Sequence, residues 1–502
     1  MTLAAAKSSQ IAVIDIGSNS VRLVIYSVSG RAVLPHYNER VMAGLGVGIS
    51  ETGRLSKEGR EKALRALRRF GAILDGLAID QIRAVATAAV RTAEDGTDFL
   101  EQAATALGDT IEILSGKDEA RLSAKGVAEG LHQADGLVGD LGGSSLEFAE
   151  IKSGEVVAGE SHLLGPLVFS NKERSPKKVR GRIADTLRSS ELLRDRGGRL
   201  YLVGGAWRAL AKLHMDLTDY PLQQLHAYRM DGRAVTMIYE ASQSSDPVVR
   251  ERLAKASQRR LEVLPYAGLA LSETFRIGGF EDVVVSSHGL REGIIFDALG
   301  RVDRDRDHLL DAIALYLGLD PRQRRFGETL FDWLLPAIRP PKDLFGSRLV
   351  ETRIIAAACL FADSGSRFHP DHRAEMAYEH ALRGPFANIT HLERAFLAFA
   401  TGARYARGFD VRKSLQPLLD KPYEKLARQL GAVMRLGAVY SGRSAEVLET
   451  CGLDIGDGKL ALKVAPGQRA MVSNAVERRL SVAANLLDLE PIVINLDESQ
   501  KA

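Results

Sequence analysis

Two short Gly/Ser-rich tips, each headed by an aspartate and flanked by apolar runs, are the first candidates for chemistry. They read Asp15-Ile-Gly17-Ser18-Asn19-Ser20 and Asp140-Leu-Gly142-Gly143-Ser144-Ser145. Glycine lets backbone N–H groups approach phosphate oxygens without a Cβ in the way, and the Ser and Asn side chains add donors. The aspartates repel phosphate but can hold Mg²⁺, which bridges to phosphate oxygens. Two facing tips would hold a phosphate chain from both sides, whereas either tip alone could be an ordinary hairpin turn.

Glu119 is the candidate for a catalytic base. It lies in the segment SGKDEARL, where Ser115 and Asp118 form a start similar to a capping box, so Glu119 falls in the first helical turn. Its carboxylate could complement the helix dipole, or it could orient and deprotonate an attacking water. Glu147, on the strand that leaves the second tip, would point either into a cleft or to solvent.

Arg91 is the candidate for binding phosphate by its side chain. It follows the predicted strand AVATAAV directly. An arginine at the carboxyl end of a strand can bind phosphate with two parallel hydrogen bonds and stabilise charge in a transition state. Thr87 is a second candidate, and a surface arginine without a function is the alternative for Arg91.

The two tips occur in two copies of one predicted unit. The first copy has a β-hairpin over residues 11–28, a helix over 56–74, a strand over 82–90, a short strand over 111–114 and a helix that begins at Ser115. The second tip follows the first at an offset of 125 residues (140 − 15) and also lies between apolar strands. This internal repeat predicts two related α/β half-domains that face each other.

The chain changes character near residue 305. Residues 308–319, 326–338 and 350–362 read as amphipathic or buried helices, and strands become scarce. The last segments, GKLALKV, NAVERRLSVAANLLD and PIVIN, read as strand, helix and strand. They predict a helical domain that ends near Gly442, followed by a small α/β domain.

The length and composition of the chain limit the classes of protein to which it could belong. The 502 residues predict about three or four domains, and the net charge of +3 excludes a general polyanion binder. Basic residues cluster at 57–69, 172–182 and 322–325, where they could line a groove or cover solvated helix faces. The two cysteines are far apart and indicate a reducing compartment. No segment has the apolar length of a membrane helix or a signal peptide, so the first ten residues are expected to be a ragged terminus.

Together these motifs resemble the exopolyphosphatase/guanosine pentaphosphatase family, within the actin-like ATPase and sugar-kinase superfamily. DIGSNSVRLVI resembles the first phosphate loop of the family, VATAAVRTAEDGTDFL its Thr/Arg segment, SGKDEARL its Ser-Gly-x-Glu-Glu-Ala-Arg segment and DLGGSSLE its second phosphate loop. VGGAWRALAKL and SSHGLREGIIFDAL are similar to segments of its second half-domain. The resemblance covers nearly the whole chain.

The resemblance implies an α/β fold with two actin-like (ribonuclease H-like) half-domains and a cleft between them. The half-domains would cover residues 1–132 and 133–304. An all-helical, degenerate HD-type domain would follow over 305–445, and a small α/β domain over 446–502.

Site roles also follow from the resemblance. Glu119 would activate water, and Arg91 and Thr87 would contact phosphate. The implied metal ligands are Asp15, Asp140 and Glu147. The implied phosphate contacts in the loops are Gly17, Ser18, Asn19, Ser20, Gly142, Gly143, Ser144 and Ser145. The sequence departs from the family at Ser144, in place of a glycine, at Leu146, in place of a threonine, and at Asp118, in place of a glutamate.

The helical region resembles a metal-dependent phosphohydrolase module that has lost ligands. The His-Asp pair of an intact module reads here as Ala362-Asp363, and an upstream segment has arginine where histidine is expected. Nearby candidates that remain are His369, Asp371, His372, His380 and His391. A second metal site is not expected, and the domain would extend a phosphate channel or a dimer interface.

The leading prediction is therefore a cytoplasmic, Mg²⁺-dependent exopolyphosphatase that releases orthophosphate from the end of inorganic polyphosphate. A monovalent cation is an additional candidate cofactor. The nearest alternative is hydrolysis of the 5′ γ-phosphate of guanosine pentaphosphate (pppGpp). A superfamily kinase, with residues 203–206 near an adenosine, and a non-catalytic phosphate sensor are more remote. A homodimer is expected, and neither nucleic acid nor a membrane is an expected partner.

Overall fold

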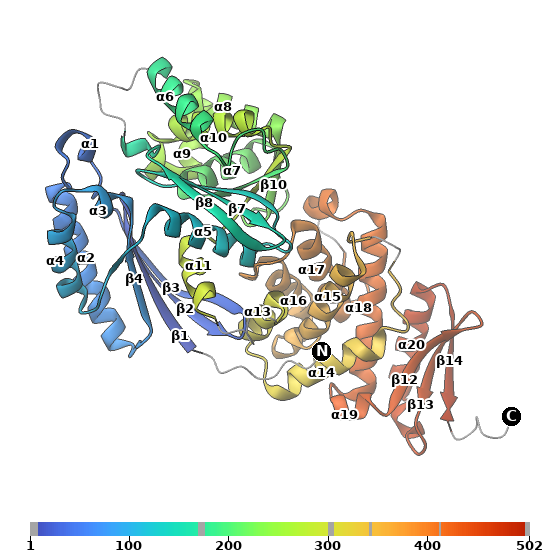
Figure 1. Ribbon diagram of the computed structural model, residues 1–502. Coiled ribbons are helices and arrows are strands. Elements are labelled where there is room, and N and C mark those ends of the chain that lie inside the picture. Colours follow the sequence, from blue (N-terminus) through green and yellow to red (C-terminus); the bar gives the residue numbers. More distant parts are fainter. Residues whose placement is uncertain (1–8, 169–175, 300–305, 341–343, 411–412, 497–502) are drawn as a thin grey trace. The chain divides into compact units, whose positions relative to one another are not determined.

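The computed structural model describes residues 9–168, 176–299, 306–340, 344–410 and 413–496 (Figure 1). The chain divides into two compact units, and the division falls between Arg306 and Asp307. This lies two residues from the predicted start of the helical region at 305.

The first sheet holds the first tip. Its strand order is β3-β2-β1-β4-β5, with β1 to β3 antiparallel and with β4 and β5 parallel to β1. The strands are β1 Ser9–Ile16, β2 Val21–Ser29, β3 Ala32–Val41, β4 Ile82–Ala86 and β5 Glu112–Ile113. Strands β1 and β2 pair antiparallel, which confirms the predicted hairpin over 11–28, and most of their apolar residues are buried.

The second sheet repeats this arrangement. Its strand order is β10-β11-β9-β6-β7-β8, with β6 to β8 antiparallel and with β9 and β11 parallel to β6. The strands are β6 Gly136–Leu141, β7 Leu146–Lys152, β8 Glu155–His162, β9 Arg199–Val203, β10 Tyr228–Asp231 and β11 Asp282–Val285. Without the edge strand β10, both sheets have three antiparallel strands followed by two parallel ones. The repeat that the two tips predicted is therefore confirmed.

Helices cover both sheets (Figure 1). With the first sheet come α1 Ile49–Thr52, α2 Lys57–Gly76, α3 Ala88–Thr92, α4 Gly96–Leu107 and α5 Gly116–Gly130. With the second come α6 Pro176–Ser189, α7 Gly205–Leu217, α8 Gly232–Gln243, α9 Pro247–Ser257, α10 Leu264–Gly278 and α11 Leu290–Ala298. The predicted helix over 56–74 is α2, which buries Leu67, Phe70 and Leu74 and has Ser56 as its N-cap.

Two of these helices pack on the sheet of the other half. Helix α5 follows the first sheet in the chain, yet its Ala120, Ala124 and Val127 are buried with residues of the second sheet. Helix α11 follows the second sheet in the chain, yet its Ile294 and Ile295 are buried with residues of β1, β2 and β4 of the first sheet. The predicted boundary at 132/133 therefore separates the two sheets along the chain. The helices α5 and α11, however, each pack on the sheet that lies on the other side of this boundary.

The contact between α5 and α11 depends on glycine. A Cβ added at Gly126 of α5 would lie 2.1 Å from the carbonyl oxygen of Gly289, and one at Gly293 of α11 would lie 1.8 Å from that of Leu122. No side chain fits in either space. The two helices therefore pack backbone to backbone between the sheets.

The predicted strand over 82–90 is too long. Strand β4 ends at Ala86, and Thr87 begins helix α3. The N–H of Thr87 still donates to the carbonyl of Ile16 (3.1 Å), but the Ala-Ala-Val run that follows turns into a helix. An apolar run of this composition fits a strand or a buried helix equally well. Arg91 consequently lies on a helix and does not follow a strand directly.

The unit that begins at Asp307 is helical at first and ends in a small sheet. Its helices are α13 His308–Leu317, α14 Pro321–Leu334, α15 Arg348–Phe361, α16 Arg373–Arg383, α17 His391–Tyr405, α18 Lys421–Ser441, α19 Ala445–Leu448 and α20 Asn474–Leu486. The sheet has the order β12-β13-β14, with β12 Cys451–Gly456, β13 Lys459–Val464 and β14 Glu490–Asn495. Strand β12, a short CGLDIG segment, was missing from the prediction. Helix α20 packs on α18, so the tail and the helices share one unit.

Asp363, the acid of the motif that the sequence analysis predicted to be degenerate, contacts two arginines and a glutamine. It is buried, and its two carboxylate oxygens accept from Arg443 Nη1 (3.0 Å) and Gln323 Nε2 (3.3 Å). Arg322 lies 3.8 Å away. His369 and Asp371 are exposed on the surface. That this region binds no second metal ion stays a prediction.

In the described part of the chain, every helix is too short or too polar to span a bilayer.

Candidate active site

The two tips have the same backbone geometry. In the first, Asp15 pairs across the hairpin with Arg22, and the N–H of Gly17 donates to the carbonyl of Ser20 (3.0 Å). In the second, Asp140 pairs with Glu147, and the N–H of Gly142 donates to the carbonyl of Ser145 (2.9 Å). Each residue of the first tip therefore has a structural counterpart 125 positions later.

Each tip is supported by a neighbouring loop, and the tips meet. The carbonyl of Ser18 accepts from the N–H of Gly46 (2.8 Å), and the carbonyl of Gly143 accepts from that of Leu167 (2.9 Å). A Cβ added at Gly143 would lie 3.2 Å from the Cβ of Ser18 and 3.6 Å from that of Asn19. Glycine at this position is what lets the two tips approach so closely.

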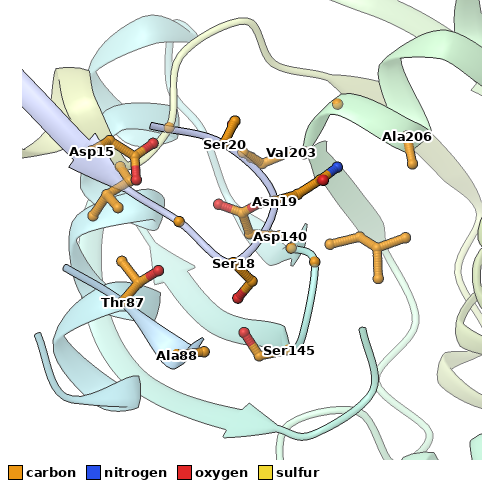
Figure 2. Close-up of a pocket in the computed structure, with 18 of the residues that line it drawn as sticks. Asp15, Ser18, Asn19, Ser20, Thr87, Ala88, Asp140, Ser145, Val203 and Ala206 are labelled. Carbon is orange, nitrogen blue, oxygen red and sulfur yellow. The ribbon is translucent and has the colours of Figure 1, made fainter. Parts of the chain in front are cut away.

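A cavity of about 190 Å³ lies between the tips. Figure 2 shows Asp15, Ser18, Asn19, Asp140 and Thr87 around it. Of the predicted site residues, those that line it are Asp15, Gly17, Ser18, Asn19, Ser20, Thr87, Glu119, Asp140, Gly142, Gly143, Ser145 and Glu147. Arg91 and Ser144 do not line it. The three acids Asp15, Asp140 and Glu119 thus share one cavity.

Glu119 reaches the cavity because of how α5 begins. Ser115 is the N-cap, and its hydroxyl accepts from the N–H of Asp118 (3.1 Å), so the chain enters the helix with Asp118 facing outward. The side chain of Asp118 is 53% exposed and that of Glu119 only 12%. Burial, together with the nearby Asp140 and against the pull of Arg91, raises the pKa of Glu119 to about 7. A carboxylate with this pKa can take a proton near neutral pH.

Arg91 holds Glu119 in place. Its Nη1 donates to the carbonyl of Leu114 (2.6 Å) and to Oε2 of Glu119 (3.3 Å). Both contacts are made from α3, one turn after Thr87. In this structure Arg91 is a positioning residue for the carboxylate, and its predicted contact with phosphate stays a prediction.

Ser144 points away from the cavity. It is 3% exposed, and its hydroxyl has no hydrogen-bond partner among the described residues. A Cβ added at Gly46 would lie 3.3 Å from this hydroxyl, so the side chain faces the loop that supports the first tip. The departure from glycine at this position therefore fills space behind the tip.

Asp140, which is half-buried, and Glu147, which is buried, form an acidic pair on neighbouring strands. Ser123 donates to Asp140 (2.6 Å), and Ser161 donates to Glu147 (2.9 Å). Burial raises the pKa of Asp140, and burial and repulsion from Glu119 and Asp140 raise the pKa of Glu147 well above its usual range. The pair is arranged to be neutralised by a proton or by a cation.

Asp15 has a different partner. Arg291 of α11 donates from Nη1 to its Oδ2 (2.9 Å), and Glu292 next to that arginine accepts from the hydroxyl of Tyr26 (2.5 Å). Within the described residues, no three acidic, histidine or cysteine side chains are placed to hold a metal ion together. Asp15 is ion-paired with Arg291, and the prediction that it holds a metal together with Asp140 and Glu147 stays a prediction. Asp140 and Glu147 remain suited to Mg²⁺, which is usually held by one or two carboxylates together with substrate phosphates.

The sequence analysis missed five arginines that line the cavity. They are Arg22, Arg40, Arg208, Arg260 and Arg291. Burial and neighbouring arginines lower the pKa of Arg40 and of Arg208 to about 10, so both remain charged at neutral pH. Four of them are isolated arginines, and Arg260 follows only Arg259. The basic clusters at 57–69 and 322–325 do not line the cavity, and residues 172–175 of the third cluster lie outside the described residues. The available signals were the place of Arg22 two residues after the first tip and the place of Arg208 and Arg291 in segments that resemble the family.

Comparisons with known proteins agree with this geometry. Residues 9–302 match the Ppx/GppA phosphatase family, and residues 347–489 match a family described as exopolyphosphatase, C-terminal. The chain belongs to the Ppx/GppA phosphatase family. The first match covers both sheets and all the cavity residues, and the second covers most of the unit that begins at Asp307.

Two relatives in the Ppx/GppA family carry different names. A guanosine-5′-triphosphate,3′-diphosphate pyrophosphatase of Aeromonas salmonicida is 26% identical over 344 residues, which are 66% of this chain and 69% of that protein. Exopolyphosphatase 2 of Mycobacterium tuberculosis is 27% identical over 321 residues, which are 58% of this chain and 99% of that protein.

Solved structures of the Ppx/GppA family share the fold. An exopolyphosphatase from Cytophaga hutchinsonii is similar with a TM-score of 0.52 and 22% identity, over 58% of this chain and 99% of that one. The Aquifex aeolicus member of the family is similar with a TM-score of 0.50 and 23% identity, over 60% of this chain and 100% of that one.

Proposed function

We propose that the chain hydrolyses the terminal phosphoanhydride bond of inorganic polyphosphate, and that it does so in the cavity between the two tips. The observation that carries this proposal is the cavity itself. It brings Asp15, Asp140 and Glu119 together beside two loops of backbone N–H groups and five arginines. Had these three acids lain on separate faces, the hydrolase interpretation would have been lost.

Glu119 is the proposed general base. Its raised pKa, about 7, is close to neutral, where a general base combines a sizeable deprotonated fraction with basicity. Arg91 orients the carboxylate by its bond to Oε2. The carboxylate takes a proton from water as the water oxygen attacks the terminal phosphorus in line, and the bridging oxygen leaves with the shortened chain.

The phosphate chain is held by groups of both halves. The N–H groups and hydroxyls of the tips donate to its oxygens, and Arg22, Arg40 and Arg208 offset its charge. Because the N–H donors belong to a fixed backbone, they need not reorganise as charge moves in the transition state.

Mg²⁺ is the proposed cofactor, with Asp140 and Glu147 as the residues that would hold it. When bound, Mg²⁺ would neutralise phosphate charge and polarise the phosphorus–oxygen bonds. The support is the raised pKa of both carboxyl groups, which a divalent cation would relieve. A monovalent cation and a role for Asp15 toward metal stay predictions.

Polyphosphate is the leading substrate, and pppGpp is the second. The match of residues 347–489 to the exopolyphosphatase C-terminal family favours polyphosphate, whereas the relative from Aeromonas salmonicida is named for a guanosine substrate. The cavity would contact the phosphate end of either molecule through the same residues.

Phosphate release by the purified full-length protein tests the proposal. Long-chain polyphosphate and pppGpp are each supplied with Mg²⁺, and kcat/KM is compared. Release from neither substrate would overturn the proposal, and ATP consumption that depends on an added sugar would favour a kinase. Asp118→Asn is the matched control, because Asp118 is adjacent to Glu119 but faces outward.

Two further proposals concern the setting of the protein. We propose a cytoplasmic location, supported by two free, buried cysteines, Cys359 and Cys451, as expected in a reducing compartment. The homodimer stays a prediction, which light scattering of the full-length protein would test.

A further inference from the structure

A set of buried polar contacts connects the interior of the first sheet to the cleft between the tips. It begins at Tyr26 of β2, whose hydroxyl donates to Oε1 of Glu292 (2.5 Å) in the first turn of α11. These two residues are 266 positions apart in the chain, and both are buried. The contacts end at Arg291, the neighbour of Glu292, which donates to Asp15 in the cleft (2.9 Å). A tyrosine of the core is therefore connected to a residue of the candidate active site.

Tyr26 reaches α11 because of its place on the first sheet. Its ring is buried with Ile294 and Ile295, on the face of the sheet that α11 covers. The pairing of β2 with β3 shifts register between Ile25 and Tyr26, as at a β-bulge. A bulge bends the strand and can re-aim the side chain beside it. The irregularity thus lies at the residue whose side chain leaves the sheet toward α11.

Glu292 uses both carboxylate oxygens to hold the start of α11. Its Oε1 accepts from Tyr26, and its Oε2 accepts from the backbone N–H of Gly289 (2.9 Å). Residues 289–291 line the cleft cavity. A Cβ added at Gly289 would lie 2.7 Å from Cγ1 of Val203, so this turn also packs tightly against the second sheet. The Glu292 carboxylate therefore fixes a turn that borders the site.

The charges along these contacts alternate in sign. Burial opposes the charge of Glu292, but Arg291 and other neighbours outweigh burial and lower the pKa of this carboxyl group. Burial likewise opposes the charge of Arg291, but Glu292 and other neighbours, Asp15 among them, raise its pKa. Burial and the adjacent Glu292 raise the pKa of Tyr26 well above its usual range, so the hydroxyl keeps the proton that it donates. Arg291 is thus a cation between two carboxylates.

The ion pair of Arg291 with Asp15 matters for an anionic substrate. Asp15 heads the first tip and lines the cavity (Figure 2). A carboxylate in this place repels phosphate oxygens unless a cation offsets its charge. An arginine offsets the charge best when its planar guanidinium is already held in place, because little side-chain entropy is then lost on binding. The contacts of Tyr26 and Glu292 provide this hold.

We propose that Tyr26 and Glu292 are positioning residues of the cleft. The bond between the hydroxyl and the carboxylate holds the 289–291 turn, and the turn keeps Arg291 at Asp15 so that a phosphate chain can approach the first tip. Neither positioning residue contacts the substrate. The inference rests on the proposed hydrolysis of a phosphate chain in this cleft, and it adds two buried residues that control how well that chain binds.

The substitution Tyr26→Phe tests the inference, because it removes the hydroxyl and keeps the buried ring. Phosphate release by the full-length protein is measured with Mg²⁺ and the preferred substrate. We expect KM to rise ~3–10-fold, as for an arginine that must be ordered on binding. The kcat should change by less than ~2-fold, because Glu119 is untouched.

The substitution Tyr37→Phe is the matched control. The Tyr37 hydroxyl also donates to a glutamate, Glu39 (2.5 Å), and both residues lie on β3 of the same sheet. Tyr37 does not line the cavity, so its variant should keep the wild-type KM. An equal rise of KM in Tyr37→Phe would indicate a general loss of sheet structure and would overturn the proposal.

A double-mutant cycle with Arg291→Lys shows whether Tyr26 acts through Arg291. Lysine keeps the positive charge but lacks the planar guanidinium. In the Arg291→Lys background, Tyr26→Phe should change KM by less than ~1.5-fold, because the group that it positions is gone. The same fold-change in both backgrounds would overturn the proposal, and so would a wild-type KM in Tyr26→Phe alone. If Tyr26→Phe does not fold, Glu292→Asp carries the same expectations, since it keeps the charge and shortens the reach of the carboxylate.

A binding measurement separates failure of this inference from failure of the proposed function. The probe is methylenediphosphonate, which mimics two adjacent phosphoryl groups and resists hydrolysis, and isothermal titration calorimetry with Mg²⁺ gives its Kd. The Kd should rise in Tyr26→Phe by the same factor as KM and stay unchanged in Tyr37→Phe. A wild type without turnover would overturn the proposed hydrolysis and leave this comparison intact. Equal Kd values for the wild type and Tyr26→Phe would overturn the positioning role.

Discussion

The two halves of the cleft have one backbone design and two chemistries. Both sheets place a Gly/Ser tip after the first strand, and both tips close with the same backbone hydrogen bond. Across the hairpin, however, the aspartate of the first tip pairs with Arg22, and that of the second pairs with Glu147. Residues 22 and 147 occupy equivalent positions and carry opposite charges.

This difference shows how a duplicated fold can form an asymmetric site. The first half presents Arg22 and Arg40 to the cavity, and Asp15 is already ion-paired with Arg291. The second half presents Asp140 and Glu147, with raised pKa values. We infer that the position after the first tip, Arg22, mainly binds phosphate oxygens and that the equivalent position after the second tip, Glu147, mainly holds a cation or a proton, while Arg208 and Arg260 of the second half also face the cavity.

The largest expected effect is at Glu119 of helix α5, the helix that packs on the second sheet. Glu119→Gln should lower kcat on the preferred substrate by at least ~100-fold and leave KM similar, because a general base contributes about 10²–10⁴-fold. Steady-state phosphate release measures this. Asp118→Asn should keep near wild-type turnover, and normal turnover of Glu119→Gln would remove this residue from the proposed role.

Substitutions of Glu147 and Arg22, which carry opposite charges at equivalent positions, should change the kinetics in different ways. Glu147→Gln should raise the Mg²⁺ concentration needed for half-maximal rate by ~10–100-fold, as the loss of one carboxylate ligand implies. Arg22→Gln should instead raise KM ~10-fold with little change in that Mg²⁺ requirement. Rates measured over a Mg²⁺ and substrate grid separate the two, with Arg83→Gln on β4 as a control. Identical changes in both variants would contradict the division of roles.

The pH dependence should follow the Glu119 carboxyl group. Its pKa of about 7 predicts that kcat/KM falls about tenfold per unit below pH 7 and levels off above it. The raised pKa also means that the folded state binds this proton more tightly than the unfolded state. The contribution of this proton to the free energy of unfolding is therefore fully present below about pH 4.5 and is lost as the pH rises through about 7.

Thermal unfolding in EDTA can detect this loss. Glu119→Gln should be more stable than the wild type at pH 8, by on the order of 1–3 kcal/mol, and the difference should shrink toward pH 5. A constant difference across this range would contradict the raised pKa.

The smallest expected effect is at Ser144. Ser144→Gly restores the glycine of the family pattern but removes a side chain that faces away from the cavity. We expect kcat/KM to change by less than ~3-fold, because the backbone around this position need not move when the serine side chain is removed. Phosphate release under the same conditions measures it, and a change above tenfold would place Ser144 in the site.

Features that depend on neighbouring residues could be predicted from the sequence, whereas features that depend on residues far apart in the chain could not. The tips, the N-cap at Ser115 and the place of Glu119 in the first helical turn depend on neighbouring residues, and the structure has them as predicted. The end of β4 was wrong because an Ala-Val run does not distinguish a strand from a buried helix. Arg40 and Arg260 reach the cavity only through the fold, so no local pattern could reveal them.

The exchange of α5 and α11 between the sheets has a consequence for synthesis. The inner face of the first sheet, including Val13 and Val24, is covered by Ile294 and Ile295, which leave the ribosome long after that sheet. A nascent chain that ends between the two halves would expose this apolar surface, and α5 would lack the sheet that buries it. The two halves should therefore mature together once residue 298 has emerged, and separately expressed halves should aggregate.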